Sequence, residues 1–385
     1  MRFEFSTAQQ IVFGPAVAAE AGELAASAGK RAFVVLGRTA QRAADLFEQL
    51  SSHDVAYQSF HVTGEPTVET VQTAVASARQ AGSEVVIACG GGSVIDTGKV
   101  VAAMLQNEGE LLDYLEVVGR GQPLAHPAAP HLAIPTTAGT GAEVTRNAVL
   151  SVPEHQVKVS MRGPFMLPRR ALVDPLLTHS MPPELTASTG LDALTQLAEA
   201  FVSNKANPLT DGICREGLRR AGRSLARAFA DGSDAAARED MALASLFSGL
   251  ALANAKLGAV HGFAGPLGGL TSAPHGVICG KLLPFVMETN VRALQEREPD
   301  SPALARFDEV ARILTGNSAA CACDAVAWTQ ELCATFGLPG LRAYGLTEDN
   351  LPTAVAKAKK ASSMKGNPIA LQDDELAAIL ERAID

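Results

Sequence analysis

The pattern of apolar residues changes near residue 180, and this change constrains the fold more than any other feature. Before it, short β-branched runs alternate with helical segments, a rhythm that predicts a parallel sheet with crossover helices. The clearest runs are residues 31–36 (RAFVVL), 84–89 (EVVIAC) and 131–135 (HLAIP). After Pro182 and Pro183 such runs disappear, and Ala- and Leu-rich stretches with helical periodicity continue to the C-terminus. We therefore expect an α/β domain at residues 1–180 and an all-helical domain at residues 181–385.

Residues 67–81 are typical of the helical segments between the expected strands. Their apolar side chains recur at a spacing that places them on one side of a helix. These side chains are Val68, Val71, Ala74, Val75 and Ala78. We expect an amphipathic crossover helix here.

Composition and charge exclude several classes of protein. The 385 residues are 47% hydrophobic, enough for two cores, and the formal charge of −9 argues against an extended nucleic-acid surface. The N-terminal residues lack the positive flank and apolar core of a signal segment, and no stretch reaches about 18 consecutive apolar residues. The six cysteines include no C-x-x-C pair, so neither a disulfide framework nor a zinc knuckle is predicted. We expect a cytoplasmic protein that binds small molecules and neither nucleic acid nor membranes.

A glycine-rich loop follows the apolar run at residues 84–89. It reads GGGSVIDTGK, residues 90–99, and leads into the apolar helical run VVAAML. Three glycines permit positive φ and close backbone approach, so amide N–H groups at the helix N-terminus can stabilise a pyrophosphate. The spacing matches neither G-x-G-x-x-G nor the Walker pattern, because Ser93 stands five residues before Gly98. A strand-to-helix turn without a ligand is the alternative interpretation.

A second loop, residues 134–145 (IPTTAGTGAEVT), also follows a short apolar strand. Its hydroxyls and glycines suit polar contacts to a ribose or a nicotinamide. The alternative is a local turn in which Thr side chains bind the backbone and cap a helix.

Side chains able to bind a metal lie in the second half of the chain. Asp192, Gln196 and Glu199 are spaced i, i+4 and i+7, so they share one helical face. His261 is expected at the end of a long Ala- and Leu-rich helix, and His275 follows beyond the glycine-rich segment GFAGPLGG. One Asp and two His form a ligand set suited to zinc or ferrous iron, with open positions for substrate. The alternative is that the histidines are polar residues satisfied within the protein.

Four segments together resemble a known family. The signature segments of iron-containing alcohol dehydrogenases are similar to GGGSVIDTGK, IPTTAGTGAEVT, GLDALTQLAEAF and GAVHGFAGPLGGLTSAPHGV, in this order and at these separations. The resemblance extends from FGP near residue 14 to Asn367-Pro368. It implies a dehydroquinate-synthase-like fold, in which an α/β dinucleotide-binding domain precedes an all-helical metal-binding domain. It also implies NAD or NADP as cofactor and a divalent metal, iron or zinc.

The resemblance assigns roles to individual residues. Cofactor-binding residues in the two loops would be Gly90, Gly91, Gly92, Ser93, Thr136, Thr137, Thr140 and Thr145, joined by Lys158. Asp96 would cap backbone amides of the first loop, and Lys99 would offset phosphate charge unless it is a surface lysine. The metal-binding residues would be Asp192, His261 and His275 with Gln196 beside them, and the two histidines are the candidate catalytic residues.

The chain departs from the family pattern at two positions. Iron-dependent members usually carry His four residues after the ligand Asp, where this chain has Gln196. Many also carry His four residues after the first histidine of the glycine-rich segment, where this chain has Gly265. Gln offers a neutral carbonyl oxygen, a poorer match to zinc or ferrous iron than imidazole. We expect the metal to be weakly bound, held by three protein ligands as in glycerol dehydrogenase, or absent.

The residues after the first apolar run bear on the choice of nucleotide. Members of the family commonly carry an Asp there, which binds the adenosine ribose 2′-hydroxyl of NAD. This chain has Gly37 and Arg38 instead, and Arg38 can pair with a 2′-phosphate. We expect NADP(H) to be accepted at least comparably to NAD(H).

The resemblance implies an oxidoreductase that moves a hydride between NAD(P)(H) and a small alcohol, aldehyde or oxoacid, with the carbonyl polarised by the metal. One alternative is a maleylacetate reductase, which reduces an oxo-dicarboxylate and would need an arginine near the substrate. Candidates for that arginine are Arg146, Arg162, Arg169 and Arg170. A dehydroquinate-synthase-like lyase and a binding or scaffold protein without activity also stay open. We expect a homodimer.

Overall fold

The computed structural model describes residues 2–38, 41–155 and 157–385, which divide into two compact units. The α/β unit contains residues 6–137 and 141–180, and the helical unit contains residues 2–5, 138–140 and 181–385. The main division thus lies where the sequence changes character. The sequence does not predict that residues 138–140 group with the helical unit.

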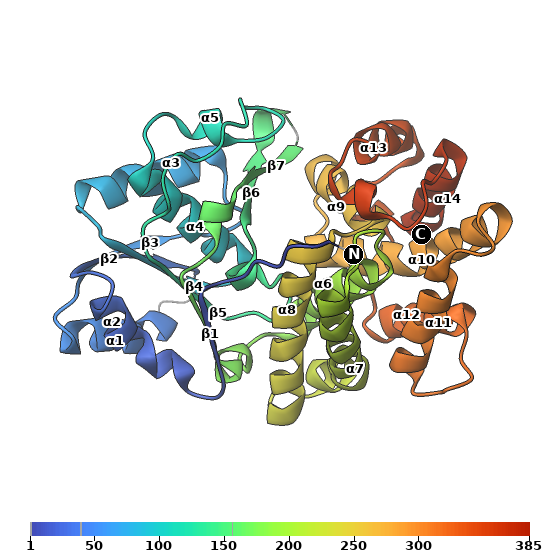
Figure 1. The fold of residues 1–385 in the computed structure, drawn as a ribbon, viewed down its shortest axis with the longest axis horizontal. Helices are drawn as coiled ribbons and strands as arrows, with labels where there is room; N and C mark the ends of the chain where they lie inside the picture. The colour runs from blue at the N-terminus through green and yellow to red at the C-terminus, as the bar shows by residue number, and fades with distance from the viewer. Residues whose placement is uncertain (1, 39–40, 156) are drawn as a thin grey trace. The chain divides into compact units, whose positions relative to one another are not determined.

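The α/β unit is built on a parallel sheet in the spatial order β1-β8-β5-β4-β2-β3 (Figure 1). Its strands are β1 (Gln10–Phe13), β2 (Arg31–Leu36), β3 (Ala56–His61), β4 (Val85–Gly90), β5 (His131–Pro135) and β8 (Arg170–Val173). The expected strands at 31–36 and 131–135 have these bounds, and the third begins and ends one residue later than expected. A separate antiparallel pair, β6 (Asn147–Val152) and β7 (Val157–Arg162), is a feature that the sequence does not predict.

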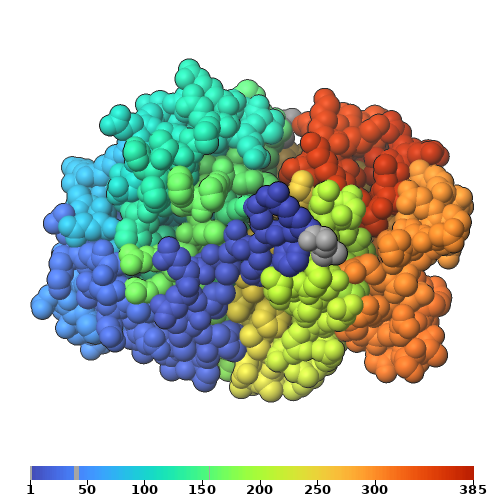
Figure 2. Space-filling model, viewed as in Figure 1, coloured from blue at the N-terminus to red at the C-terminus, as the bar shows by residue number. Residues whose placement is uncertain are grey.

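Both faces of the sheet are covered, because successive strand side chains point to opposite faces. Phe33 and Val35 belong to the same apolar cluster as α3 and α4, whereas Ala32 and Val34 belong to the cluster of α1 and α2. The helices of this unit are α1 (Ala21–Ala26), α2 (Gln41–Ser52), α3 (Val68–Gln80), α4 (Gly92–Gln106) and α5 (Leu111–Tyr114). The predicted crossover helix is α3, which buries Val71, Ala74, Val75 and Ala78. The stretch that follows α5 lies on the surface of the unit (Figure 2).

The strand order reverses between β2 and β4. From β2 the chain first adds β3 on one side, and then returns to place β4 on the other side. Ligands of open α/β sheets bind outside the carboxyl ends of the strands at such a reversal. Leu36 and Cys89 pair in register there, so the residues that follow β2 and β4 lie at the point where a ligand is expected.

The helical unit has α6 (Pro183–Val202) packed against α7, α8 and α10. The other helices are α7 (Pro208–Ala230), α8 (Ala235–Ala255), α9 (Ala259–Leu270), α10 (His275–Arg297), α11 (Pro302–Thr315), α12 (Ala322–Thr335), α13 (Leu351–Ala358) and α14 (Asp373–Ile384). From Gly190 to Val202 every side chain of α6 is buried, so polar residues on this helix must find partners inside the unit.

Short 3-10 helices complete both units. They are η1 (Val17–Glu20), η2 (Ala142–Val144), η3 (Pro153–His155), η4 (Pro164–Met166), η5 (Pro175–Thr178), η6 (Leu341–Tyr344), η7 (Glu348–Asn350) and η8 (Ser363–Gly366). In the part of the chain that the structure describes, no single helix has the length and hydropathy to cross a membrane. The bent pair α8 and α9 meets those two criteria only when its members are taken together.

Candidate active site

The glycine-rich loop connects β4 to α4. Gly91 is the residue before the helix, and Gly92 and Ser93 are its first two residues. The amides at the start of an α-helix have no acceptor within that helix, and the helix dipole adds partial positive charge there. The structure therefore gives the loop the strand-to-helix setting in which a pyrophosphate can be bound.

The first two positions of this loop require glycine because a side chain would not fit there, and not because the backbone has an unusual conformation. Gly91 has φ −76°, so the expectation that the loop depends on positive φ is wrong at this residue. A Cβ on Gly90 would lie 2.6 Å from the Val94 side chain, and a Cβ on Gly91 would lie 3.3 Å from that of Thr137. Side chains larger than hydrogen would crowd the loop at both positions.

The second loop meets the first in the α/β unit. Pro135 pairs with Gly90 in register, and the amide of Thr136 donates a hydrogen bond of 3.0 Å to the Gly90 carbonyl. Thr136 and Thr137 thus lie beside the glycines at the carboxyl ends of adjacent strands. Thr140 groups with the helical unit.

Lys99 is buried and bound within the protein, which argues against its predicted role at a phosphate. Its Nζ donates to Thr145 Oγ1 at 2.7 Å and to the Asn147 carbonyl at 2.8 Å, and lies 3.4 Å from Asp96 Oδ1. These three acceptors match the three N–H groups of an ammonium. Lys99 and Thr145 therefore join α4 to the segment before β6, and their roles at a cofactor stay predictions.

Asp96 caps a backbone amide, but outside the glycine-rich loop. Its Oδ2 accepts a hydrogen bond of 2.9 Å from the amide of Val149 in β6. Burial raises the pKa of Asp96 and lowers the pKa of Lys99, and the attraction between the two charges opposes both shifts. The pair is therefore a structural element of the α/β unit.

Two further titratable groups are buried near Lys99. Burial raises the pKa of Glu143 to about 7. Burial, assisted by the charge of Lys99, lowers the pKa of His131 to about 3. Neither ring nitrogen of His131 has a hydrogen-bond partner among the described residues. A Cβ on Gly98 would lie 2.8 Å from His131 Nε2, so α4 lies close against β5 at this residue.

The remaining predicted cofactor residues lie at the surface or pair with neighbours. Arg38 follows β2 at the strand reversal, and its Nε donates a hydrogen bond of 2.8 Å to the Thr63 carbonyl. The Gly37 carbonyl lies 3.0 Å from His61 Nδ1. Lys158 forms an ion pair of 2.5 Å with Glu65.

Two of the four arginines considered for a dicarboxylate substrate have internal partners. Arg162 pairs with Glu116, and Arg170 donates to the Leu24 carbonyl and to Ser27. Arg169 is exposed directly before β8. Arg146 is half-buried directly before β6.

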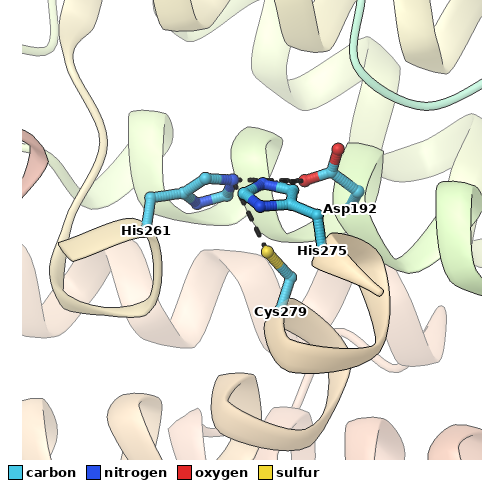
Figure 3. Close-up of side chains that lie close together, drawn as sticks. All are labelled: Asp192, His261, His275 and Cys279. Atoms are coloured by element: carbon cyan, nitrogen blue, oxygen red, sulfur yellow. Dashed lines mark hydrogen bonds and ion pairs between the residues drawn. The ribbon is translucent and has the colours of Figure 1, made fainter. Parts of the chain in front are cut away.

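The predicted metal residues of the helical unit do come together (Figure 3). Asp192 Oδ1 lies 3.2 Å from His261 Nε2 and 3.6 Å from His275 Nε2. The fourth member is Cys279, whose Sγ lies 3.7 Å from His261 Nε2. The potential ligand atoms of these four residues, which we call the metal cluster, all lie within 4.8 Å of one another.

His261 occupies the first turn of α9, and not the end of a long helix as expected. The preceding helix α8 ends at Ala255, and α9 begins at Ala259. The glycine-rich segment after His261 is helical too, with Pro266 inside α9. The break between α8 and α9 aims the imidazole at α6.

Glu199 fixes the position and tautomer of His261. Its carboxylate accepts a hydrogen bond of 2.6 Å from the amide of Val260 and lies 2.7 Å from His261 Nδ1. A carboxylate can only accept, so Nδ1 carries the proton and Nε2 is left to face Asp192 and Cys279. Carboxylate–histidine pairs of this kind orient metal-binding imidazoles.

Charge is concentrated in the metal cluster. Burial lowers the pKa of His261, but the electrostatic interaction with Cys279 and the hydrogen bonds to Asp192, Cys279 and Glu199 outweigh it and raise the pKa well above its usual value. The pKa of His275 is raised, since burial is again outweighed by Cys279 and Asp192. Burial raises the pKa of Asp192, but the two histidines outweigh that effect and the net shift is downward.

Gln196 lies next to the cluster with an unsatisfied oxygen. Its side chain is buried and hydrogen bonds to Asp192, which helps to lower the pKa of that carboxyl. Oε1 has no hydrogen-bond partner among the described residues. An unpaired buried oxygen is costly, so the polar atoms of this region are incompletely satisfied by the protein alone.

Glycines let α10 approach α6. A Cβ on Gly276 would lie 1.9 Å from the Ser188 carbonyl oxygen, and one on Gly280 would lie 2.7 Å from the Leu191 side chain. The close approach brings residues 275 and 279 of α10 to Asp192.

Comparison with known proteins identifies the family. The sequence profile of the iron-containing alcohol dehydrogenase family matches residues 8–175, and the profile of the C-terminal part of the Fe-containing alcohol dehydrogenase family matches residues 186–384. The 1,3-propanediol dehydrogenase of Klebsiella pneumoniae is 38% identical over 320 residues, 83% of this chain and 80% of the relative. The chain belongs to the iron-containing alcohol dehydrogenase family. Its members are oxidoreductases, and the named relatives act on alcohols.

Solved structures agree with this membership. A crystal structure of 1,3-propanediol oxidoreductase superposes with a TM-score of 0.91 at 34% identity, covering 100% of both chains. The structure of sulfoacetaldehyde reductase from Bifidobacterium kashiwanohense, in complex with NAD+, has a TM-score of 0.86 at 28% identity and covers 100% of this chain and 99% of the other. The predicted fold, an α/β domain followed by a helical domain, is confirmed.

The residues present fit the metal that an iron-containing alcohol dehydrogenase implies. Carboxylate, imidazole and thiolate are ligands of zinc and of other divalent transition metals. The oxygen of Gln196 that lacks a partner is the kind of buried atom that a bound ion or its water would satisfy. At Gly265, where many members carry histidine, a Cβ would meet no described atom within 4 Å.

The sequence analysis places Glu199 beside Asp192 without giving it a role of its own, and it does not identify Cys279. Glu199 shares the helical face of Asp192, and this spacing was the available signal for its role. Cys279 stands four residues after His275, a spacing that places both on one face of α10. A histidine and a cysteine at i and i+4 were therefore a signal for the fourth member of the metal cluster.

Proposed function

We propose that this chain catalyses hydride transfer between NAD(P)(H) and a small alcohol or its aldehyde, with a divalent metal at the metal cluster. The observation that carries the proposal is the convergence of Asp192, His261, His275 and Cys279, with Glu199 fixing one imidazole. The 1,3-propanediol dehydrogenase relative supports a small alcohol as substrate, and the NAD+ complex of sulfoacetaldehyde reductase supports the nicotinamide cofactor.

The α/β unit would bind the dinucleotide. The first amides of α4, and the glycines before them that leave no room for side chains, suit a pyrophosphate. Thr136 and Thr137 lie beside these glycines, and their hydroxyl groups suit the sugar or the nicotinamide. Arg38, exposed after β2 at the strand reversal, would face the adenosine ribose. Because Lys99 is bound within the protein, the backbone amides have to supply most of the donors to the phosphates.

The helical unit would bind the metal that polarises the substrate carbonyl. Asp192, His261 and His275 would hold the metal, which when bound supplies a Lewis acid for the carbonyl oxygen. Glu199 keeps the Nδ1 proton of His261 in place, so Nε2 stays directed at the cluster. Since position 265 carries no titratable side chain, the proton of the alcohol has to leave through water, a cofactor hydroxyl or another side chain.

A substrate panel tests the proposal. Aldehydes, 2-oxoacids, an oxo-dicarboxylate and alcohols are each assayed with NADH, NADPH and the oxidised cofactors, before and after chelation and metal addition. We expect stoichiometric consumption of NAD(P)H with small aldehydes, lost on chelation and restored by metal. Full activity after complete chelation, or reduction of the oxo-dicarboxylate alone, would favour a metal-independent maleylacetate reductase. Product formation without net NAD(P)H consumption would favour a lyase, and no turnover with any compound would oppose an enzymatic role.

A further inference from the structure

The metal cluster contains one side chain that the family resemblance does not assign. Cys279 lies on α10 one turn after His275, and its side chain is fully buried. Figure 3 shows its sulfur pointing at the space between the two imidazoles and Asp192. The other buried cysteines of the helical unit, Cys214 and Cys333, are not members of the cluster.

We propose that Cys279 is a metal ligand, and that its thiolate makes the site an Asp–His–His–Cys set that selects zinc over ferrous iron. This inference rests on the proposed function, because it concerns the same metal site. It replaces the expectation of a weak three-ligand site: the thiolate of Cys279 takes the place of the imidazole that is missing at Gln196.

The separations between side chains agree with one shared ion. In a tetrahedral site with bonds of about 2.0–2.3 Å, neighbouring ligand atoms stand about 3.3–3.7 Å apart. Asp192 Oδ1 lies 3.2 Å from His261 Nε2 and 3.6 Å from His275 Nε2, and Cys279 Sγ lies 3.7 Å from His261 Nε2. These three separations are close to those of a tetrahedral ligand set, and all the ligand atoms lie within 4.8 Å of one another.

Charge favours Cys279 over Gln196 as the fourth ligand. A buried ion is most stable where its charge is balanced, because desolvating a net charge is costly. Two neutral imidazoles with the anions of Asp192 and Cys279 balance a divalent ion within the ligand set itself. With Gln196 in place of the thiolate, the second negative charge would be the more distant carboxylate of Glu199, which faces Nδ1 on the opposite side of the His261 ring. The side chain of Gln196 is also hydrogen bonded to Asp192, which places it beside a ligand as an orienting group.

The donor set also decides which metal is preferred. Zinc binds more tightly than ferrous iron to most nitrogen, oxygen and sulfur sites, and a soft thiolate adds to that preference. Catalytic zinc can expand to five ligands, so four protein ligands do not exclude a substrate. We therefore expect the isolated protein to retain about one zinc per chain in the presence of competing ferrous iron.

Cobalt substitution tests this assignment directly. The full-length protein is stripped with a chelator and titrated with Co2+, because a cobalt–thiolate bond gives an intense charge-transfer absorption in the near ultraviolet that oxygen and nitrogen ligands do not give. We expect this absorption to saturate at one Co2+ per chain in the wild type. Its absence at saturation would overturn the proposal, and this measurement needs no variant that might fold poorly.

Single substitutions identify which cysteine binds the metal. Cys279→Ser should abolish the absorption and lower zinc affinity by roughly 100-fold in competition with a chromophoric chelator. Cys333→Ser is the matched control, since Cys333 is a buried cysteine of the same unit whose Sγ donates to the Gly280 carbonyl, a bond that serine can keep. Gln196→Leu should leave the absorption unchanged. Unchanged zinc affinity in folded Cys279→Ser, or an absorption that disappears only in Gln196→Leu, would overturn the proposal.

The same preparations separate this inference from the proposed function. The charge-transfer absorption without turnover of any carbonyl would support the ligand assignment while opposing the proposed function. Metal-dependent turnover without the absorption would support the proposed function while overturning the assignment of Cys279.

Discussion

The two units of this chain use their buried charges in opposite ways. In the α/β unit the buried cation Lys99 is matched by acceptors from Asp96, Thr145 and Asn147, so the charge is satisfied by the protein itself. In the helical unit Asp192 and Cys279 gather with two imidazoles, and the neighbouring oxygen of Gln196 has no partner among the described residues. Satisfied charges stabilise a structure, whereas gathered and incompletely satisfied groups indicate a ligand.

The difference extends to which atoms carry function. The α/β unit offers backbone amides at the start of α4, and its side chains near the loop are mostly small. The helical unit offers side chains that come from three separate helices, α6, α9 and α10. A substitution at the glycine-rich loop should therefore weaken nucleotide binding by filling space. A substitution at the metal cluster should weaken metal binding by removing a ligand atom or the side chain that orients it.

The largest effect is expected from filling space at the glycine-rich loop. Gly91→Val would place methyl groups against Thr137 and above the first α4 amides. Losing two charge-assisted hydrogen bonds to the pyrophosphate corresponds to roughly 100-fold or more in NAD(P)H affinity. The change is measured by fluorescence titration of NAD(P)H. Gly163→Val is the control, because a Cβ there makes only an ordinary contact of 3.9 Å with Leu124. Wild-type nucleotide affinity in folded Gly91→Val would refute the assigned loop.

The next effect concerns support for a ligand in the helical unit. Glu199→Gln keeps the shape of the side chain but removes the charge that holds the Nδ1 proton of His261. Loss of such a partner typically lowers metal affinity about 10- to 100-fold. Chelator competition measures the change, and Glu309→Gln is the control, since it removes an ion pair with Arg215 away from the metal cluster. Equal metal affinity in wild type and Glu199→Gln would show that His261 needs no such support.

Sequence patterns predicted those parts of the fold that local side chains decide. The bounds of β2 and β5 agree with the β-branched runs because these strands are apolar and buried on both faces. The shared face of Asp192, Gln196 and Glu199 followed from helical spacing alone. The family resemblance supplied the convergence of His261 and His275 with Asp192, which spacing does not give.

The remaining features depend on contacts between segments far apart in the chain. Nothing local ends α8 at Ala255: the break before α9 is held by Glu199 and Asn367, which accept hydrogen bonds from the amides of Val260 and Ala259. Burial of Lys99 likewise depends on Thr145, 46 residues later. Residues 138–140 group with the helical unit, where Ser248 donates to the Gly139 carbonyl. No pattern within a short window encodes such pairs.

A pH-dependent effect on stability tests the burial of His131, a side chain of the α/β unit whose ring nitrogens have no hydrogen-bond partner among the described residues. The pKa of His131 is lowered to about 3, mainly by burial, from an unfolded value of about 6.5. The unfolded chain thus binds a proton that the folded protein excludes, and His131 costs stability as the pH falls from about 6.5 toward 3. Between pH 7 and pH 5 this loss amounts to about 2 kcal/mol.

His131→Leu should remove that loss. Its free energy of unfolding, relative to that of the wild type, should therefore be about 2 kcal/mol larger at pH 5 than at pH 7. Urea unfolding at both pH values measures the difference. The raised pKa of Glu143 gives stability the opposite pH dependence, lost as the pH rises through about 7, but Glu143 is present in both proteins and largely cancels. A difference that does not change with pH would show that His131 is readily protonated in the folded protein.

The smallest effect is expected at Arg38, whose charge lies at the surface of the α/β unit. Its Nε is held by the Thr63 carbonyl, which directs the guanidinium without neutralising it, so the remaining N–H groups are suited to a 2′-phosphate. An exposed ion pair contributes up to about 1 kcal/mol, so Arg38→Ala should lower the ratio of kcat/KM for NADPH to that for NADH roughly fivefold. The decrease should shrink as salt is raised, because exposed charges are screened. Arg120→Ala, which removes another exposed arginine of the same unit, should leave the ratio unchanged. A wild type that strongly prefers NADH, or a ratio unaffected by Arg38→Ala, would show that Arg38 does not read the 2′-phosphate and that this unit recognises its cofactor through the backbone alone.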